Sequence, residues 1–568
     1  MRRLSLALLA LLLGAGCASP TGRTAGNAAH LAAPADPAAP PQRLSARDKR
    51  KLLGIVAAGR LETLQRPEFG DYQAELGEFY RSDGYSLAWV EGSKPTAKAR
   101  ALIKLLQAAD DKGLLADDYD GSRWAGRLAS LELSERGASE PKLLSFDLAL
   151  SICAMRYISD LHFGRINPLL FHNTFDVAPD IRGPSDFLSK RVAPAQDVAA
   201  ALDPVEPPFA AYRRLVKAVQ RYQELAREDD GEFLPPSFKP AIKPGDRYSG
   251  VPRLTRLLRL LGDLPPRASA DPAIYAGSLV KAVKRFQRRH GLDSDGLLGA
   301  ETLKELNTPL AHRLSQLRLS LERWRWFPHH FSRPPIIINI PEFRLYAGDS
   351  RPQRIVVGMA FEHETPVFDS LLTSVVFRPP WNVPMSIQLE ELVPLIEKDP
   401  SYLARQDIEI TDGEGRVVST GTASTAHLGL LRAGQLYLRQ RPGPGNSLGL
   451  VKFLMPNGHS VYLHGTPSRW GFSRSRRDLS HSCIRVEDPG ALAAWVLRDR
   501  PEWTAQRIRA AMTGTQTVTV KLAKPIAVLI QYGTAVVKDD GEVRFFNDLY
   551  SHDAAEESAF AQRARVAW

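Results

Sequence analysis

A cysteine in a polar segment with two histidines has the clearest chemical potential in this chain. Segment 462–486 reads YLHGTPSRWGFSRSRRDLSHSCIRV. Cys483 has His481 two residues before it and Arg485 two residues after it, and His464 lies near the start of the segment. A thiol is a weak nucleophile until an imidazole or a positive dipole helps to remove its proton. The pattern therefore predicts nucleophilic catalysis by Cys483, with His464 at the end of an expected strand.

The other two cysteines indicate different roles. Cys153 lies in FDLALSICAMRYISDLHFG, an apolar helical pattern in which cysteine is a small buried hydrophobic residue. Cys17 follows two arginines, a short apolar run and small residues, as in an export signal. The apolar run is too short to span a membrane. Because Cys17 directly follows small residues, the segment resembles a lipobox and predicts lipidation, with plain cleaved secretion as the alternative.

Length and charge set broad limits. The chain has 568 residues, enough for two to four domains. Its formal net charge is +11, which favours an anionic partner such as nucleic acid, a membrane surface or acidic cell-wall polymers, unless it is only a solvated basic surface. No basic stretch interleaved with aromatics stands out, so no nucleic-acid partner is expected.

The pattern of apolar residues changes along the chain, from helical to stranded. Residues 1–17 form the expected signal, and the Ala/Pro-rich residues 18–45 predict a disordered tether. Apolar residues at three- and four-residue spacing predict a helical scaffold over 46–245. From about 335 onward, alternating β-branched segments such as PIIINIPEFRLYAG and GHSVYLHGT predict strands, with a few helices between them.

A compact unit at 246–310 carries a recognisable spacing. Its segments AVKRFQRRHGL and DGLLGAETLKELN resemble the small three-helix peptidoglycan-binding module. Most of the matching residues form turns and core, so they predict the fold better than they predict binding. They are Phe286, Gln287, Gly291, Leu292, Asp295, Gly296, Gly299, Thr302, Leu306 and Asn307.

The cysteine segment resembles the signature of the YkuD-type L,D-transpeptidases. That signature is a histidine, 14–17 residues, and then Ser/Thr-His-Gly-Cys; here 15 residues separate His464 from Ser480. The resemblance implies that Cys483 is the acyl acceptor and that His464 is its base. It further implies that the carbonyl of Gly465 orients His464, that His481 shapes the loop, and that no metal or cofactor is needed, although two histidines and a cysteine could in principle bind a metal.

The same resemblance implies how substrate is held. Backbone N–H groups around Ser482 and Cys483 would face the oxyanion, with Ser480 nearby, and Arg485 would position a carboxylate or brace the loop. The family has glycine where this chain has Ser482. If that position needs a positive φ, serine there is strained, and its hydroxyl would either alter the oxyanion hole or add a donor.

Similarity to the large, YcbB-like branch extends over nearly all of residues 70–550. PPWNVPMSI, RQRPGPGNSLGLVKFLMPNGHSVYLHGTP and DLHFGRINP carry it. It implies an α+β multidomain fold: the scaffold, the module, a connecting helix at 311–334, a mainly β catalytic domain at 335–540 and a C-terminal segment at 541–568. A lid insertion at about 385–440 would cover the groove. Four residues could line that groove or be structural: Trp381, Asn382, Tyr437 and Asn446.

The implied activity is acyl transfer in the periplasm, contributing to cell-wall organisation and cell shape. Cys483 would attack a tetrapeptide stem, release D-Ala and form a thioester, which the amine of a second stem resolves to give a 3→3 crosslink. Peptidoglycan stems would be both donor and acceptor, and lipidated Cys17 would tether the enzyme to the outer membrane. The alternatives are an L,D-carboxypeptidase, a hydrolase that detaches proteins from the wall, or a non-catalytic peptidoglycan-binding protein.

Overall fold

The computed structural model describes residues 43–132, 139–171, 183–236 and 239–562, with side chains as far as residue 560. The expected signal peptide, most of the expected tether and Cys17 lie outside these residues. Within the described part of the chain, no helix combines the length and the apolar character that crossing a membrane would require.

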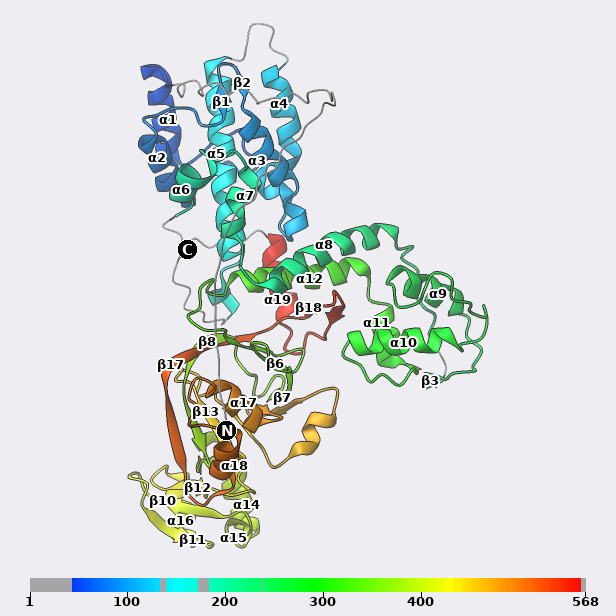
Figure 1. Cartoon of the computed structure of the whole chain (residues 1–568), viewed down its shortest axis with the longest axis vertical. Helices are drawn as coiled ribbons and strands as arrows, with labels where there is room; N and C mark the ends of the chain where they lie inside the picture. Colours follow the sequence, from blue (N-terminus) through cyan, green and yellow to red (C-terminus); the bar gives the residue numbers. More distant parts are fainter. Residues whose placement is uncertain (1–42, 133–138, 172–182, 237–238, 563–568) are drawn as a thin grey trace, which may run out of the picture. The chain divides into compact units, whose positions relative to one another are not determined.

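The first helical region is built around one long buried helix (Figure 1). Helix α5 (Glu140–Phe163) contributes Cys153, which is fully buried in a core shared with its neighbours. The apolar residues of α5 are not confined to one stripe, as expected for a helix surrounded by others. The other helices of this region are α1 (Ala46–Ala58), α2 (Gln73–Ser82), α3 (Ala97–Gln107), α4 (Trp124–Glu132), α6 (Pro184–Phe187) and α7 (Val198–Leu202).

Helix α8 (Ala210–Glu228) belongs to a different core, although the helical pattern predicted one scaffold over 46–245. Its apolar face, including Tyr212 and Leu215, packs with α12 (Leu310–Arg325) and with the hairpin of β18 (Ala535–Val537) and β19 (Val543–Phe545). Helical spacing shows that a helix has an apolar face, but it does not show which partner covers that face.

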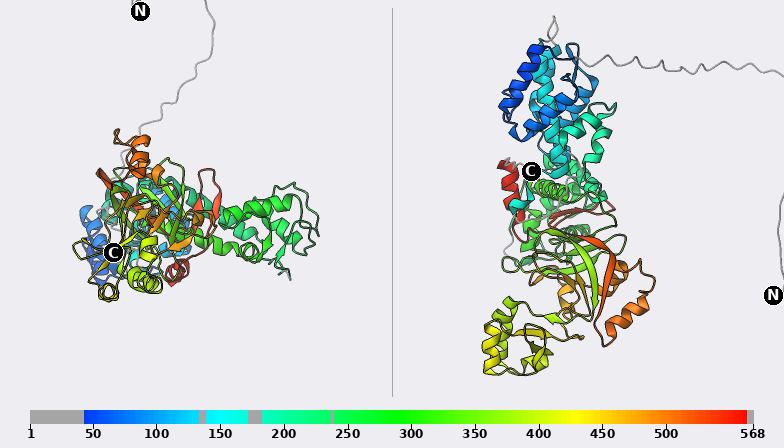
Figure 2. Two further views of the ribbon diagram at one scale, coloured as in Figure 1. Left: turned by 90° about the horizontal axis from the view of Figure 1, so that it is seen from below. Right: turned by 90° about the vertical axis from the view of Figure 1, so that its left-hand side faces the viewer.

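The small module has a core of its own, and its helices form a separate group in Figures 1 and 2. Gln287 at its centre donates to Asp295 Oδ1 (2.8 Å) and accepts from the N–H of Gly296 (2.8 Å). These bonds fix the turn that the sequence pattern marks. The module consists of α9 (Val251–Leu260), α10 (Ser278–Arg289), α11 (Ala300–Leu306), β3 (Ala241–Ile242) and β4 (Leu298–Gly299).

The C-terminal helix α19 (His552–Gln562) is held against α12 by buried ion pairs. Arg323 lies 2.7 Å from Asp553 Oδ1 and 2.9 Å from Glu556 Oε2, and all three side chains are almost completely buried. Removing one partner from such a group leaves an uncompensated buried charge. The ion pairs therefore tie the end of the chain to the helix that precedes the β region.

The β region is a nine-stranded sheet in the order β15-β7-β16-β14-β13-β8-β17-β5-β6. Because β6 also pairs with β7, eight of these strands close into a barrel, and Figure 2 shows the longer ones curving together. Helix α17 (Pro489–Val496) and helix α18 (Ala505–Thr513) contribute to its core. The strands are β5 (Ile336–Asn339), β6 (Arg344–Ala347), β7 (Gln353–Gly358), β8 (Phe368–Phe377), β13 (Val451–Leu454), β14 (Leu463–His464), β15 (Asp478–Ser480), β16 (Ile484–Val486) and β17 (Val518–Gln531).

The expected insertion forms a second, four-stranded sheet in the order β11-β10-β12-β9. Strands β10, β11 and β12 are coloured yellow-green to yellow in Figure 1. Residues such as Val383, Ile410 and Leu438 give it an apolar core separate from that of the barrel. The insertion is therefore a subdomain rather than a long loop. Its elements are β9 (Trp381–Asn382), α13 (Met385–Ile387), η8 (Gln388–Leu392), α14 (Val393–Lys398), α15 (Tyr402–Arg405), β10 (Ile408–Thr411), β11 (Val417–Thr420), α16 (Thr425–Arg432) and β12 (Tyr437–Gln440).

Candidate functional site

Strand register places three basic side chains beside one another. Lys452 on β13 pairs with His464 on β14, and His464 pairs with Arg485 on β16. Directly paired residues on neighbouring strands point to the same face of the sheet. His464 is therefore flanked by a lysine and an arginine, and the next residue of the same face along the chain is Tyr462.

Cys483 lies immediately before β16, and its side chain is half-buried. Burial raises the pKa of the Cys483 thiol, whereas hydrogen bonds from Tyr462 and the charges of Lys452 and Arg485 act to lower it. The net direction is upward, so the thiol is protonated at rest. Removal of the Cys483 proton therefore requires a base.

His464 has the properties of such a base. Its Nδ1 lies 2.6 Å from the carbonyl oxygen of Gly465, the contact that the sequence predicts. Burial, and then the charge of Arg485, lower the pKa of His464 to about 3. The imidazole is therefore neutral, although hydrogen bonds to the carbonyls of Gly465 and Leu448 oppose the fall in its pKa. With Nδ1–H donated to Gly465, Nε2 is the nitrogen that carries no proton.

The Cys483 thiol and the His464 imidazole are not hydrogen-bonded to each other in this structure. Among the described residues no hydrogen bond links Cys483 to His464, and the Cys483 Sγ faces the carbonyl oxygen of Ser460 at 3.9 Å. Catalytic hydrogen bonds are often long or misaligned before substrate binds.

Ser482 has the positive φ that would favour the glycine found at this position in the family. Its φ is 66°, in the left-handed region that favours glycine. The N–H of Cys483 donates to the carbonyl oxygen of His481 (2.8 Å), so residues 481–483 form a three-residue γ-turn around Ser482. Thr365 Oγ1 donates to the carbonyl oxygen of Ser482 (2.7 Å) and holds the turn from the other side.

The two N–H groups expected to face the oxyanion make other hydrogen bonds in this structure. The N–H of Ser482 donates to the carbonyl oxygen of His363 (3.1 Å), and the N–H of Cys483 is used within the turn. The Ser482 hydroxyl also donates to the His363 carbonyl (3.3 Å). Both predicted N–H donors are therefore occupied, because a γ-turn forms its own bond across the residue at its centre.

His481 and Ser480 support the loop. His481 Nε2 lies 2.6 Å from Glu391 Oε1 of the insertion, and its ring packs against that of His363 with centroids 4.3 Å apart. Ser480 Oγ donates to the carbonyl oxygen of Cys483 (2.5 Å). His481 thus connects the cysteine loop to the subdomain that was predicted to act as a lid.

Arg485 and Lys452 are the two cations beside His464 that have no carboxylate partner among the described residues. Both are only partly buried, and the Lys452 Nζ lies 3.8 Å from the centroid of the Tyr462 ring. A partly buried face with two cations that form no ion pair with a carboxylate attracts anionic groups. This arrangement suits a substrate that carries a carboxylate.

The four candidate groove residues have different surroundings. A hydrogen bond from Trp381 reaches Tyr462, and through it the thiol's surroundings. Asn382 is exposed on β9 opposite Arg439, and Tyr437 is exposed on β12 opposite Thr411. Asn446 is buried, and its amide nitrogen donates to the carbonyl oxygen of Arg441 (2.9 Å) while Oδ1 accepts from the N–H of Leu448 (2.8 Å). Asn446 therefore braces the backbone of its own loop, the structural alternative given for it above.

Tyr462 and Lys452 were missing from the candidates read from the sequence. Tyr462 precedes His464 by two positions in an expected strand, and this spacing puts both side chains on one face. That signal was available. Lys452 could not be found in the same way, because only the pairing of β13 with β14 brings it beside His464.

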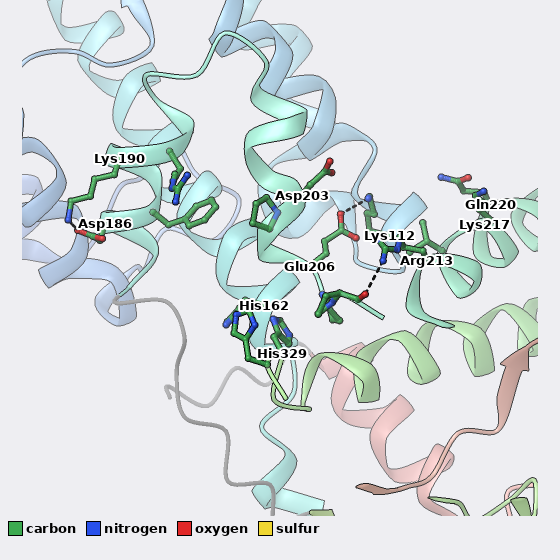
Figure 3. Close-up of a pocket in the computed structure, with 17 residues that line it drawn as sticks. Lys112, His162, Asp186, Lys190, Asp203, Glu206, Arg213, Lys217, Gln220 and His329 are labelled. Atoms are coloured by element: carbon green, nitrogen blue, oxygen red, sulfur yellow. Dashed lines mark hydrogen bonds and ion pairs between the residues drawn. The ribbon is translucent and has the colours of Figure 1, made fainter. Parts of the chain in front are cut away.

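A second region, unrelated to the thiol, holds a cavity with a volume of about 1100 Å³. Figure 3 shows its side chains spread along several helices rather than gathered around one point. Two of its lysines are neutralised there, because Lys112 lies 2.5 Å from Glu206 and Lys190 pairs with Asp186. The cavity shares no residue with the cysteine site.

Three stretches of the chain match family models. Residues 74–219 match a scaffold domain, residues 247–306 match a "putative peptidoglycan binding domain", and residues 333–526 match the L,D-transpeptidase catalytic domain YkuD. A curated relative from Haemophilus influenzae, described as a "putative L,D-transpeptidase", is 32% identical over 243 residues. The match covers 42% of this chain and 48% of the relative, so the chain spans about half the length of the curated relative it matches. The predicted domain types and α+β fold class are confirmed.

Proposed function

Since this chain carries a YkuD-type L,D-transpeptidase catalytic domain together with a scaffold domain and a peptidoglycan-binding domain, we propose that it forms 3→3 crosslinks between peptidoglycan stems. The carrying observation is the neutral His464, fixed by the Gly465 carbonyl and flanked by Lys452 and Arg485, close to a cysteine. We assign the enzyme to the periplasm. Tethering through lipidated Cys17 is a separate part of this proposal.

In the first step, His464 Nε2 takes the proton of Cys483, and the thiolate attacks the carbonyl between the L-centre of the diamino acid and D-Ala. The C–N bond then breaks, the imidazolium gives its proton to the departing D-Ala amine, and a thioester remains on Cys483. A side-chain amine of a second stem attacks the thioester, loses a proton to His464 and releases the thiol. Atoms and charge balance without a cofactor.

Tyr462 is our candidate for the oxyanion donor that the loop N–H groups do not supply. Burial and the neighbouring Cys483 raise the pKa of Tyr462, so its hydroxyl keeps its proton, and Trp381 also hydrogen-bonds to it. The ammonium of Lys452 lies over its ring. A hydroxyl donor next to a cation stabilises developing negative charge. Tyr462→Phe should therefore lower kcat more than it changes KM.

The proposed role of the insertion follows from His481. The His481–Glu391 contact and the Trp381–Tyr462 contact both connect the insertion to the cysteine loop. A subdomain with its own core can shift on its hinges without disturbing the barrel. We assign it the role of a lid that completes the site when a stem binds.

Mass spectrometry of products from purified disaccharide-tetrapeptide tests this function. Crosslinked dimers with loss of D-Ala are expected. Tripeptide monomers alone would show that water replaces the amine, making the enzyme an L,D-carboxypeptidase. Absence of both products, together with absence of a carbapenem adduct at Cys483, would leave a non-catalytic wall-binding protein.

A further inference from the structure

An arginine-rich cavity of about 290 Å³ lies apart from the cysteine site and shares none of its residues. Its walls come from the end of α10 and the loop after it, from residues 341–344, from Arg354 on β7, from residues 472–477, and from β19 and the two residues after it. Six arginines line it against two carboxylates, Asp293 and Glu342. The arginines are Arg288, Arg344, Arg354, Arg474, Arg477 and Arg544.

Three of the arginines are already engaged. Arg354 Nε lies 3.0 Å from Glu487 Oε1, and Arg544 Nε lies 2.7 Å from Glu542 Oε1. Arg477 is buried and donates to backbone carbonyl oxygens, including that of Ile355 (3.1 Å). These contacts fix the cavity wall but do not remove its excess of positive charge.

The other three, Arg288, Arg344 and Arg474, form no direct ion pair with a carboxylate among the described residues, although the charge of Arg344 acts on Glu342 and Glu487. Arg344 is half-buried and pairs across the strands with Arg354, so the two guanidinium groups emerge from neighbouring positions. Burial, and next the charges of Arg344 and Arg354, lower the pKa of Arg477 to about 10. Guanidinium groups gathered in this way repel one another until an anion lies between them.

We propose that this cavity binds free carboxylates of peptidoglycan stem peptides, as a second contact with the polymer outside the catalytic groove. The planar guanidinium fork matches a carboxylate in geometry. The cavity volume lies near the lower end of the range for small-ligand pockets, which suits part of one stem rather than a whole strand. This inference rests on the proposed function for the nature of the polymer.

The position of the lining residues in the chain favours peptidoglycan over other anions. Arg288 to Ser294 on one wall fall within the peptidoglycan-binding match at 247–306. Phe472 to Arg477 on the other wall lie between His464 and Cys483 in the chain. A stem held here contacts both the module and the segment that carries the catalytic residues, which keeps the polymer close to the thiol by raising its effective concentration.

Retention on purified peptidoglycan sacculi tests the proposal. The full chain carrying Cys483→Ala is used so that no turnover occurs, and Arg288→Glu with Arg474→Glu are added to it, because both side chains are exposed. Arg344→Gln forms a second, independent variant. We expect the apparent Kd for sacculi to rise about tenfold in the double variant and less in Arg344→Gln, with the difference shrinking at high salt.

Arg351→Glu is the matched control, since Arg351 is exposed between β6 and β7 but does not line the cavity. A second control uses sacculi whose carboxylates have been converted to amides. On these sacculi the parent should bind no more tightly than the double variant does. Unchanged retention of both cavity variants, equal weakening by Arg351→Glu, or retention on anionic vesicles in place of sacculi would overturn the proposal. Carbapenem labelling of Cys483-containing protein reports on the catalytic proposal separately, so each can fail alone.

Discussion

Two turns contain a residue with left-handed backbone, one in the module and one in the cysteine loop, but only the module turn has glycine there. In the module, Gly296 has a φ of 78°, and a Cβ there would lie 2.7 Å from Lys284 Cε and 3.0 Å from Val280 Cγ1. In the cysteine loop, Ser482 has a φ of 66° and is not glycine. The module turn has the residue that its conformation favours, whereas the loop has a strained residue directly before Cys483, the proposed nucleophile. Strain of this kind concentrates at functional sites.

The comparison implies that changes in the loop affect chemistry first, and changes in the module affect stability first. Cys483→Ala is the strongest test of the first half. D-Ala release from disaccharide-tetrapeptide should fall by at least about a thousandfold, because Cys153, the other cysteine in the described part of the chain, is buried. The thermal midpoint should stay close to that of the parent. Residual release near the parental rate would remove Cys483 from the nucleophile role.

His464→Gln should lower kcat by roughly a hundredfold or more, since proton transfer contributes on that scale. Glutamine can keep a hydrogen bond to the Gly465 carbonyl, so the loop should remain folded. The single-turnover rate of Cys483 acylation by a carbapenem is the measurement. A fall in binding without a fall in acylation rate would show a structural role instead.

The buried His464 should also make the folded state more sensitive to acid. Its folded pKa of about 3 lies below the ordinary value of 6.5, so the unfolded chain binds more protons between these values. The contribution of His464 to the free energy of unfolding is therefore largest above pH 6.5 and falls as the pH drops toward 3. Between pH 6.5 and 4.5 the loss is at most about 2.7 kcal/mol. Urea unfolding of His464→Gln against the parent should show a shallower dependence on pH; parallel curves would contradict the neutral buried imidazole.

Gly296→Ala tests the module half of the comparison. The left-handed conformation and the close approach of Val280 should cost about 1–2 kcal/mol of unfolding free energy. Gly443→Ala is the matched control, because Gly443 has no neighbour within 4 Å of an added Cβ and no left-handed φ. Chemical denaturation measures both. Equal effects of the two substitutions would show that the module turn does not require glycine at position 296.

Ser482→Gly should have the smallest effect, between no change and about 1 kcal/mol of added stability. Relief of the left-handed φ is partly offset by the greater freedom of glycine in the unfolded chain. Activity should be intact or raised. A clear loss of activity would instead assign a role to the Ser482 hydroxyl, whose present partner is the His363 carbonyl oxygen.

The fold was predictable wherever a local pattern specified a local structure. The turn residues around Gln287 predicted the module, and the alternation in GHSVYLHGT predicted a strand ending at His464. The helical region was predicted as a whole, whereas the core that α8 joins was not, because an amphipathic pattern does not identify the partner that covers its apolar face. Closure of the barrel through β6 and β7 also has no local signal.

The sequence by itself determined which residues are proposed to carry the chemistry and how they are spaced: Cys483, His464 and the carbonyl after it, and a non-glycine residue before Cys483. Only the tertiary structure decided what surrounds them. Strand pairing brought Lys452 and Arg485 to either side of His464, and the γ-turn at Ser482 used the N–H groups expected to bind the oxyanion. Spacing along a chain fixes neighbours within a strand or turn, whereas neighbours across a sheet depend on long-range pairing.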